Sequence, residues 1–220
     1  MARHLCENCE RPVSACICSF ISKTDNKTPV LILQHPSEIK QSKGTVALLK
    51  RSLNNCHVLI GEDFSNNAEL NTIIDKHNAL LLYPSDNAQT LNCSFENTQK
   101  TDAEAKINKQ PLLIILDGTW KKAYRMFMLS TNLHCLQHVC LPSEIANNGQ
   151  YLIRKVAKKN ALSSLEATCY ALAILENELT VSANINEREN DEMNAIYSGR
   201  YQLILDKFSQ FNQFQLSFRK

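Results

Sequence analysis

Short apolar runs alternate with helical patterns between residues 29 and 142, and this alternation constrains the fold more than any other feature. Strands are expected at residues 30–33, 57–60, 79–83, 112–116 and 133–141. Helices are expected between them at residues 46–53, 68–77 and 121–129. Parallel strands need such crossover helices, so the rhythm predicts an α/β fold with a mostly parallel sheet flanked by helices.

An insertion and two closing helices complete the expected fold. Residues 85–110 are polar and lack clear periodicity, which is typical of an exposed insertion. A helix is expected at residues 163–179, because Ser163 and Glu166 have the spacing of a capping box. A second helix is expected at residues 191–208.

The composition is that of an ordinary globular protein. The 220 residues suffice for one α/β domain, and the apolar runs are too short to span a bilayer. The N-terminus lacks the pattern of a secretory signal, so we expect a cytoplasmic protein without a membrane partner. The net charge of +2 neither demands nor excludes a nucleic-acid partner. The oligomeric state stays open, with a monomer favoured.

The first eighteen residues contain a cysteine pattern, C-x2-C-x6-C-x-C, formed by Cys6, Cys9, Cys16 and Cys18. Four thiolates this close in sequence can surround one tetrahedral ion. Zinc is the natural candidate, and an iron–sulfur cluster also suits thiolate ligands. With four protein ligands the ion would serve structure or RNA contact, because no coordination position is left for catalysis. We expect a four-cysteine zinc-binding module at residues 1–24 and one further domain at residues 25–220; a reduced tail without metal is the alternative.

The strongest expected strand ends in Asp117, which is followed by Gly118 and a helix. Open α/β sheets bind ligands at the carboxyl ends of their strands. There, Gly118 would let the backbone approach a ligand, and Trp120 offers a flat face that can stack on an adenine or a flipped base. On the local pattern alone, the alternative is favoured: Asp117 caps the helix and Trp120 belongs to the core.

A second polar cluster follows the first expected strand. His35 can donate a hydrogen bond to a phosphate or a carboxylate, and Glu38 can help shape the loop together with Ser42 and Thr45. Two strand-end clusters indicate one crevice. The alternative is a loop in which His35 and Glu38 only bond the backbone.

A third cluster precedes the helix expected from residue 163. Arg154 is a candidate anion contact, and the N-terminus of that helix is another. Considered alone, Ser163 and Glu166 are a helix cap and nothing more.

Basic residues gather around the same segments. Such a distribution gives a nearly neutral chain a positive face that a phosphate backbone would need, although individual solvated lysines are the alternative. The residues are Lys40, Lys43, Lys50, Arg51, Lys121, Lys122, Arg125, Arg154, Lys155, Lys158 and Lys159.

Taken together, these segments resemble the DTW-domain family, and in particular its bacterial tRNA-uridine aminocarboxypropyltransferases. The likeness covers nearly the whole chain and rests on five motifs in family order. These are the N-terminal cysteines, His35-Pro36-x-Glu38, Asp117-x-Thr119-Trp120, Tyr151-x-x-Arg154, and Ser164 with Glu166 and Ala167.

The resemblance implies a fold and a reaction. The fold would be related to the SPOUT methyltransferases, with a knotted C-terminal ligand site. The reaction would transfer the 3-amino-3-carboxypropyl group of S-adenosylmethionine to N3 of a tRNA uridine and release 5'-methylthioadenosine. S-adenosylmethionine is then a substrate, zinc is structural, and tRNA is the macromolecular partner.

The resemblance also implies roles for individual residues. Asp117 is expected to be catalytic, as the base that removes the uridine N3 proton, together with Thr119 and Trp120. The expected S-adenosylmethionine pocket consists of His35, Thr45, Gly118, Thr119, Trp120, Ala123, Ser164 and Glu166. The expected tRNA contacts are Lys43, Arg51, Lys121, Lys122, Arg125, Arg154, Lys155 and Lys158.

Two other functions compete with this one. An S-adenosylmethionine-dependent RNA methyltransferase would share the fold and the substrate but attack the methyl carbon. A non-catalytic RNA-binding protein with a zinc module would explain the cysteines and the basic segments, but it would leave residues 117–120 without a purpose. The sequence leaves open which tRNA and which uridine are modified.

Overall fold

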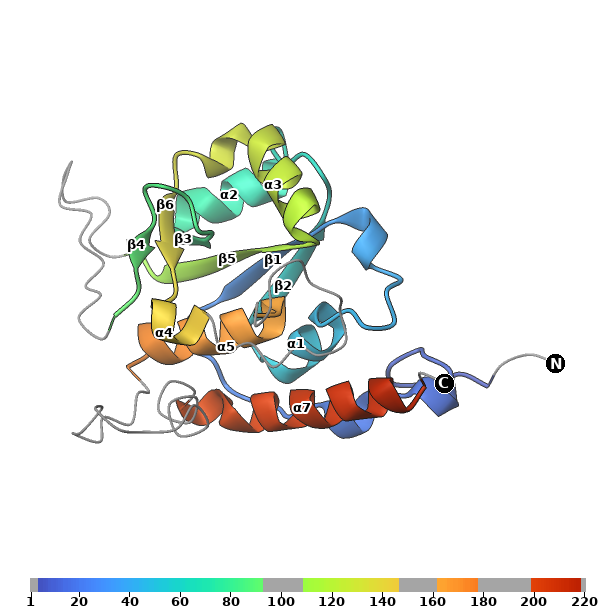
Figure 1. Cartoon of the computed structure of the whole chain (residues 1–220). Helices are drawn as coiled ribbons and strands as arrows, with labels where there is room; N and C mark the ends of the chain where they lie inside the picture. Colours follow the sequence, from blue (N-terminus) through green and yellow to red (C-terminus); the bar gives the residue numbers. More distant parts are fainter. Residues whose placement is uncertain (1–3, 93–108, 147–161, 178–198, 219–220) are drawn as a thin grey trace.

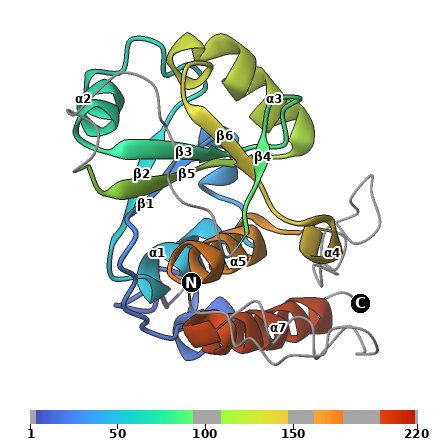
Figure 2. The ribbon, with the colours of Figure 1, turned by 90° about the vertical axis from the view of Figure 1, so that its left-hand side faces the viewer.

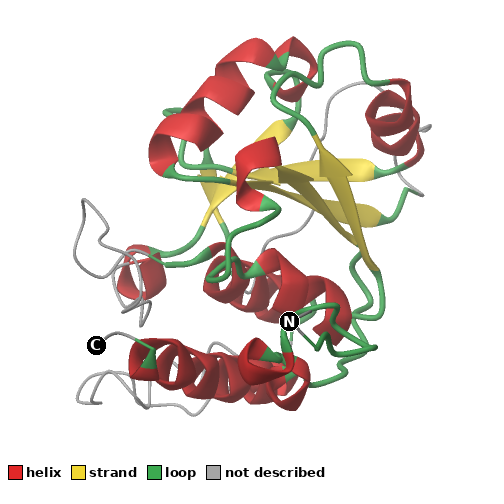
Figure 3. Cartoon of the chain, turned by 90° about the vertical axis from the view of Figure 1, so that its right-hand side faces the viewer, coloured by secondary structure: helices red, strands yellow, loops and turns green. Residues whose placement is uncertain are grey.

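The computed structural model describes residues 4–92, 109–146, 162–177 and 199–218. Helices cover both faces of a central sheet (Figure 1). Helices α2 (Ala68–Lys76) and α3 (Trp120–Leu129) lie on one face, and α1 (Val46–Ser52) and α5 (Ser164–Leu175) lie on the other (Figure 2). Helix α7 (Gln202–Ser217) forms an outer layer beneath α5 (Figure 3).

The sheet has six strands in the order β2-β1-β5-β3-β6-β4, and every pair of neighbouring strands is parallel. The predicted α/β fold with a mostly parallel sheet is therefore confirmed. The strands are β1 (Val30–Gln34), β2 (Cys56–Ile60), β3 (Asn78–Leu82), β4 (Gln89–Thr90), β5 (Pro111–Asp117) and β6 (Gln137–Cys140).

Short helical segments occupy several connections. They are α4 (Ser143–Ala146) and the 3-10 turns η1 (Val13–Ala15), η2 (Cys18–Phe20), η3 (Pro36–Glu38), η4 (Thr131–Leu133) and η5 (Gly199–Tyr201).

Strand β1 shows why the chain folds into layers. All of its residues are buried, and alternate side chains of a strand point to opposite faces. Val30 and Ile32 join the hydrophobic core under α1, α5 and α7, whereas Leu31 and Leu33 join the core under α2 and α3. A strand that is apolar on both faces is typical of a parallel sheet covered on both sides.

The cysteine segment packs against the outer layer of the protein. Ile17 is fully buried in the same core as α5 and α7. The ring of Phe20 contacts Phe211 and Phe214 of α7, with centroids 5.7 and 5.2 Å apart. The segment thus shares its core with the rest of the chain, and the division into residues 1–24 and 25–220 stays a prediction.

Several expected boundaries differ from the structure. The expected strand at 133–141 is shorter, because residues 131–133 form η4 and only residues 137–140 form a strand, β6, which pairs with β3. Within the polar stretch, β4 adds an edge strand beside β6, while residues 93–108 lie outside the described residues.

The last helix extends beyond its expected end at residue 208. Phe208, Phe211 and Gln215 are all buried, so one face of α7 continues to pack for two more turns. The expected start at residues 191–198 lies outside the described residues. Helix α5 ends at Leu175 instead of residue 179, and Asn177 there has a positive φ of 53°.

The described residues include no helix that is both long enough and apolar enough to cross a lipid bilayer.

Candidate active site

The carboxyl ends of β1 and β5 meet at the point where the strand order reverses. From β1 the chain passes through α1 to β2 on one side, and the later strands lie on the other side beyond β5. Parallel sheets leave a crevice at such a point, and ligands bind there. Asp117, Gly118, His35 and Glu38 of the first two predicted strand-end clusters lie at this edge. Ser42 of the second cluster instead lines a cavity near the N-terminal cysteines.

Asp117 joins three elements through its buried carboxylate. One oxygen, Oδ2, accepts a hydrogen bond from Nε2 of Gln34 at 3.0 Å, and Oδ1 accepts one from Oγ of Ser164 at 2.8 Å. Gln34 is its partner across the β1–β5 pair, and Ser164 is the first residue of α5. Asp117 and Ser164 were both predicted site residues, and the structure brings them into contact. Gln34 was not among the predicted site residues, although a polar residue at the end of an apolar strand is a usable signal.

Thr119, not Asp117, caps helix α3. Its side chain accepts a hydrogen bond from the backbone N–H of Lys122. Trp120, the first residue of the helix, is 55% exposed. The alternative in which Asp117 caps the helix and Trp120 packs in the core is therefore wrong, because Thr119 is the cap and the Trp120 side chain is largely exposed.

Gly118 lies where two loops approach closely. A Cβ atom at this position would lie 3.0 Å from Cβ of Lys122 and 3.8 Å from Cβ of His35. Ala123, whose backbone nitrogen would be 3.5 Å away, is buried below it. A side chain at residue 118 would therefore crowd the first turn of α3 at Lys122, whereas its distance to His35 would be an ordinary van der Waals contact.

His35 is held between its own loop and the end of β2. Its Nδ1 accepts a hydrogen bond from the backbone N–H of Ser37, so Nε2 carries the proton that faces Oε1 of Glu62 at 3.3 Å. The same Glu62 oxygen accepts a bond from Nε of Arg125 at 3.0 Å. His35 therefore bonds both the backbone and a carboxylate. Glu62 was not predicted, although it follows an expected strand as Asp117 does.

Glu38 forms an ion pair with Lys122, with Oε1 and Nζ 2.8 Å apart. The carboxylate is 3% exposed and the lysine 32%. A carboxylate removed from water needs such a partner. The pair ties the loop after β1 to the first turn of α3, so Glu38 does more than bond its own backbone.

The start of α5 has a complete capping box. The Ser163 N–H donates to Oε2 of Glu166 at 2.7 Å, and Oγ of Ser163 accepts from the Glu166 N–H at 3.2 Å. The helix-cap role is thus confirmed for both residues, while Ser164 turns toward Asp117. Thr45 is buried at the start of α1, where its carbonyl accepts from the first turn.

The basic residues predicted to contact RNA have different surroundings. Lys122 and Arg125 form ion pairs with Glu38 and Glu62, whereas Lys121 is exposed. Arg51 donates to the backbone carbonyl of Asn8 at 3.3 Å. Lys43 lines a cavity near the N-terminal cysteines. Tyr151, Arg154, Lys155 and Lys158 lie outside the described residues.

The four N-terminal cysteines form one cluster, with their sulfur atoms all within 4.8 Å of one another. The Sγ atoms of Cys6 and Cys18 are 3.8 Å apart, and those of Cys9 and Cys16 are 3.7 Å apart. A tetrahedral ion bound at about 2.3 Å by four sulfurs requires sulfur–sulfur distances of about 3.8 Å. The cluster could therefore hold a metal ion.

The thiols differ in acidity. At Cys9, burial raises the pKa, but hydrogen bonds from the backbone of Ile17 and Arg11 and from neighbouring thiols outweigh burial and lower the pKa to about 6. Burial, followed by the thiols around it, raises the pKa of Cys18 to about 12. An ionised thiolate at Cys9 thus makes ionisation of the neighbouring Cys18 thiol less favourable. A bound cation would offset the repulsion between the thiolates.

Comparison with known proteins identifies the family of this chain. The model of the DTW domain matches residues 3–216. The chain belongs to the DTW domain family. Similar relatives are tRNA-uridine aminocarboxypropyltransferase 2 of Drosophila melanogaster (34% identity over 79% of this chain and 67% of that protein), the protein of the same name from Macaca fascicularis (34%, 78% and 56%), and tRNA-uridine aminocarboxypropyltransferase A of Arabidopsis thaliana (26%, 79% and 73%).

This DTW chain spans just over half of the macaque relative and about two thirds of the fly relative. No solved structure matched it.

The cysteine cluster leads to a prediction about metal content. Cys9→Ser should prevent the cluster from holding a metal ion and lower the unfolding temperature, because Cys9 is a buried member of the cluster that also packs in the core. Elemental analysis and thermal unfolding would measure both effects. Cys135→Ser is the matched control, since Cys135 is exposed and lies outside the cluster. Equal metal content in both variants would contradict the prediction.

Proposed function

We propose that this DTW protein transfers the 3-amino-3-carboxypropyl group of S-adenosylmethionine to N3 of a tRNA uridine and releases 5'-methylthioadenosine. The observation that carries the proposal is the coincidence of the DTW family match with a polar cluster at the β1–β5 crevice. The names of the relatives identify tRNA-uridine as the acceptor and aminocarboxypropyl as the group transferred.

The reaction requires positional control. The sulfonium makes all three attached carbons electrophilic, so the pocket must align the aminocarboxypropyl carbon with uridine N3 and turn the methyl carbon away. The carbon–sulfur bond breaks as the nitrogen–carbon bond forms. The electron pair stays on sulfur, which leaves as methylthioadenosine, and the N3 proton goes to a base.

Asp117 is our candidate for that base. It lies at the end of β5, and its two hydrogen bonds hold the carboxylate in one orientation at the crevice. Each carboxylate oxygen can accept more than one hydrogen bond, so these bonds leave Asp117 able to accept the proton of N3–H. A purely positioning role is the competing assignment.

The S-adenosylmethionine pocket is proposed to surround Asp117. Trp120 would stack on the adenine, and Thr119 and Gly118 would supply backbone and hydroxyl contacts. His35, Thr45, Ala123, Ser164 and Glu166 would complete the walls from β1, α1, α3 and α5. Buried Thr45, Ala123 and Glu166 would then act mainly by shaping the pocket.

Further parts of the proposal concern the protein around the pocket. The basic residues named above would hold the tRNA backbone, and the cysteine cluster would bind a structural zinc ion, as its sulfur spacing favours. A reducing compartment such as the cytoplasm would keep these thiols reduced and therefore able to bind the ion. The SPOUT-like, knotted C-terminal site and the monomeric state remain part of the proposal.

One experiment tests the function as a whole. The protein is incubated with unmodified tRNA and S-adenosylmethionine, and mass spectrometry identifies the modified nucleoside and the spent cosubstrate. Methylthioadenosine and an aminocarboxypropyl uridine are expected. S-adenosylhomocysteine would instead identify a methyltransferase, and the absence of both products would favour a non-catalytic RNA-binding protein.

The variant Asp117→Asn distinguishes a general-base role of Asp117 from a purely positioning role. An asparagine can still accept from Ser164, and the Gln34 amide can rotate to face its new NH2 group. We expect kcat to fall about 10²- to 10⁴-fold, the usual range for loss of a general base, with S-adenosylmethionine affinity nearly unchanged. Ser164→Ala is the control, because it removes one hydrogen bond but keeps the carboxylate. Equal losses in the two variants would assign Asp117 to positioning.

Trp120 should contribute binding energy without contributing much stability. Trp120→Ala is expected to weaken S-adenosylmethionine binding by about 1–3 kcal/mol, typical of one aromatic stacking contact. Isothermal titration calorimetry would measure it, with thermal unfolding as the check on folding. Tyr124→Ala is the matched control, since Tyr124 lies one turn later on α3 and is 57% exposed. An unchanged affinity in Trp120→Ala would remove Trp120 from the pocket.

A further inference from the structure

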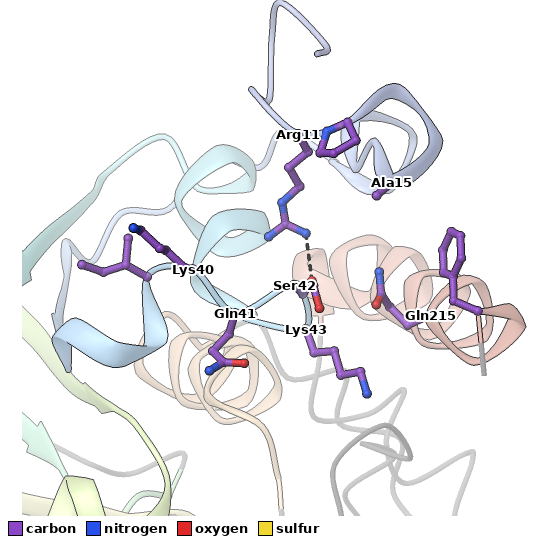
Figure 4. Close-up of a pocket in the computed structure, with 10 residues that line it drawn as sticks. Arg11, Ala15, Lys40, Gln41, Ser42, Lys43 and Gln215 are labelled. Carbon is purple, nitrogen blue, oxygen red and sulfur yellow. Dashed lines mark hydrogen bonds between the residues drawn. The ribbon is translucent and has the colours of Figure 1, made fainter. Parts of the chain in front are cut away.

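A cavity away from the crevice lies between three segments that are distant in sequence. Its volume is about 490 Å³, and it is lined by the cysteine segment, the loop after η3 and the C-terminal end of α7 (Figure 4). Its lining residues include neither Asp117 nor any residue of the expected S-adenosylmethionine pocket. The residues important here are Arg11, Ile39, Lys40, Lys43, Gln215 and Phe218.

The charged groups of this cavity are all positive. Arg11, Lys40 and Lys43 line it, and no acidic residue is among its described lining residues. Arg11 donates from Nη1 to the carbonyl of Ser42 at 2.9 Å, which fixes its guanidinium at the cavity (Figure 4). A guanidinium has five N–H donors, so one held in this way can still donate to a phosphate oxygen.

Apolar side chains lie beside these cations. Ile39 is 49% exposed and Phe218 is 54% exposed, and both line the cavity. Single-stranded nucleic acid is bound by this combination, in which cations contact the phosphate and an aromatic ring stacks on the base. A simple inorganic anion cannot stack on an aromatic ring, so it would make no such contact with Phe218.

One short segment connects the cavity with the candidate active site. His35 and Glu38 lie at the crevice, and residues 39–43 line the cavity. The backbone N–H of Gln41 donates to the carbonyl of Glu38 at 3.1 Å, so the segment is folded back on itself between the two places. An RNA that reaches the crevice can therefore extend along the same loop.

We propose that this cavity binds a backbone phosphate and the adjoining unpaired base of the RNA substrate, at a nucleotide other than the uridine that reacts. The inference rests on the proposed function, which makes RNA the substrate. The cavity then sets which RNA is accepted, while the crevice carries out the transfer.

The test measures tRNA affinity of the full chain over a range of salt concentrations. Lys40→Gln and Lys43→Gln should each weaken binding and reduce the slope of log K against log[salt] by about 1. Lys76→Gln is the matched control, because Lys76 ends α2 on the opposite face of the sheet (Figure 1). The KM for tRNA should rise in the cavity variants more than kcat falls, and S-adenosylmethionine affinity should stay unchanged.

The stacking part of the proposal has its own pair of variants. Phe218→Ala should lower tRNA affinity about five- to 150-fold without changing the salt slope. Leu203→Ala, at an equally exposed apolar residue of α7, should leave the affinity unchanged.

The outcomes separate this inference from the proposed function. Cavity variants that bind tRNA as tightly as the wild type would overturn the inference and leave the cavity to another polyanion, such as an acidic protein segment. Wild-type protein that binds tRNA through the cavity but forms no modified uridine would instead overturn the proposed function. Thermal unfolding of each variant shows whether a lower tRNA affinity is caused by unfolding of the protein.

Discussion

The two hydrogen bonds to the Asp117 carboxylate determine how the candidate active site is assembled. They connect β1, β5 and the first turn of α5, which are separated by long stretches of sequence. Because a buried carboxylate without donors is costly, the hydrogen bonds from Gln34 and Ser164 stabilise Asp117 at this buried position. The same bonds place the capping box of α5 beside the crevice, so the end of the sheet and the start of the helix form one unit.

Carboxylates at the other strand ends organise the surrounding loops in a similar way. Glu62 accepts bonds from His35 and Arg125, and Glu38 accepts one from Lys122. Much of the positive charge beside the crevice is thereby balanced within the protein. The cavity lined by Arg11 and Lys40 differs, because its described lining residues include no carboxylate. The affinity for RNA would accordingly depend on residues 39–43 of this loop, and the transfer reaction would depend on the preceding residues at the crevice.

The sequence predicted the layered fold better than it predicted the site. Apolar runs such as β5 are long and unambiguous, so their strands and the parallel sheet were confirmed. The two-residue strand β4 has no such run and depends on pairing with β6. Local pattern favoured Asp117 as a helix cap, but long-range contacts to Gln34 and Ser164 decided its position. Those contacts carry no periodic signal, which is why Gln34 and Glu62 were missed.

The cysteine segment is connected with the cavity through backbone contacts. The Cys6 N–H donates to the carbonyl of Arg11 at 2.8 Å, and Glu10, between Cys9 and Arg11, has a positive φ of 59°. A residue with a side chain adopts that conformation only when its surroundings hold it there. A metal ion on the four sulfurs would hold this turn, and Arg11 in turn holds the carbonyl of Ser42. The role of the metal would then be to position the cavity, not to take part in the transfer.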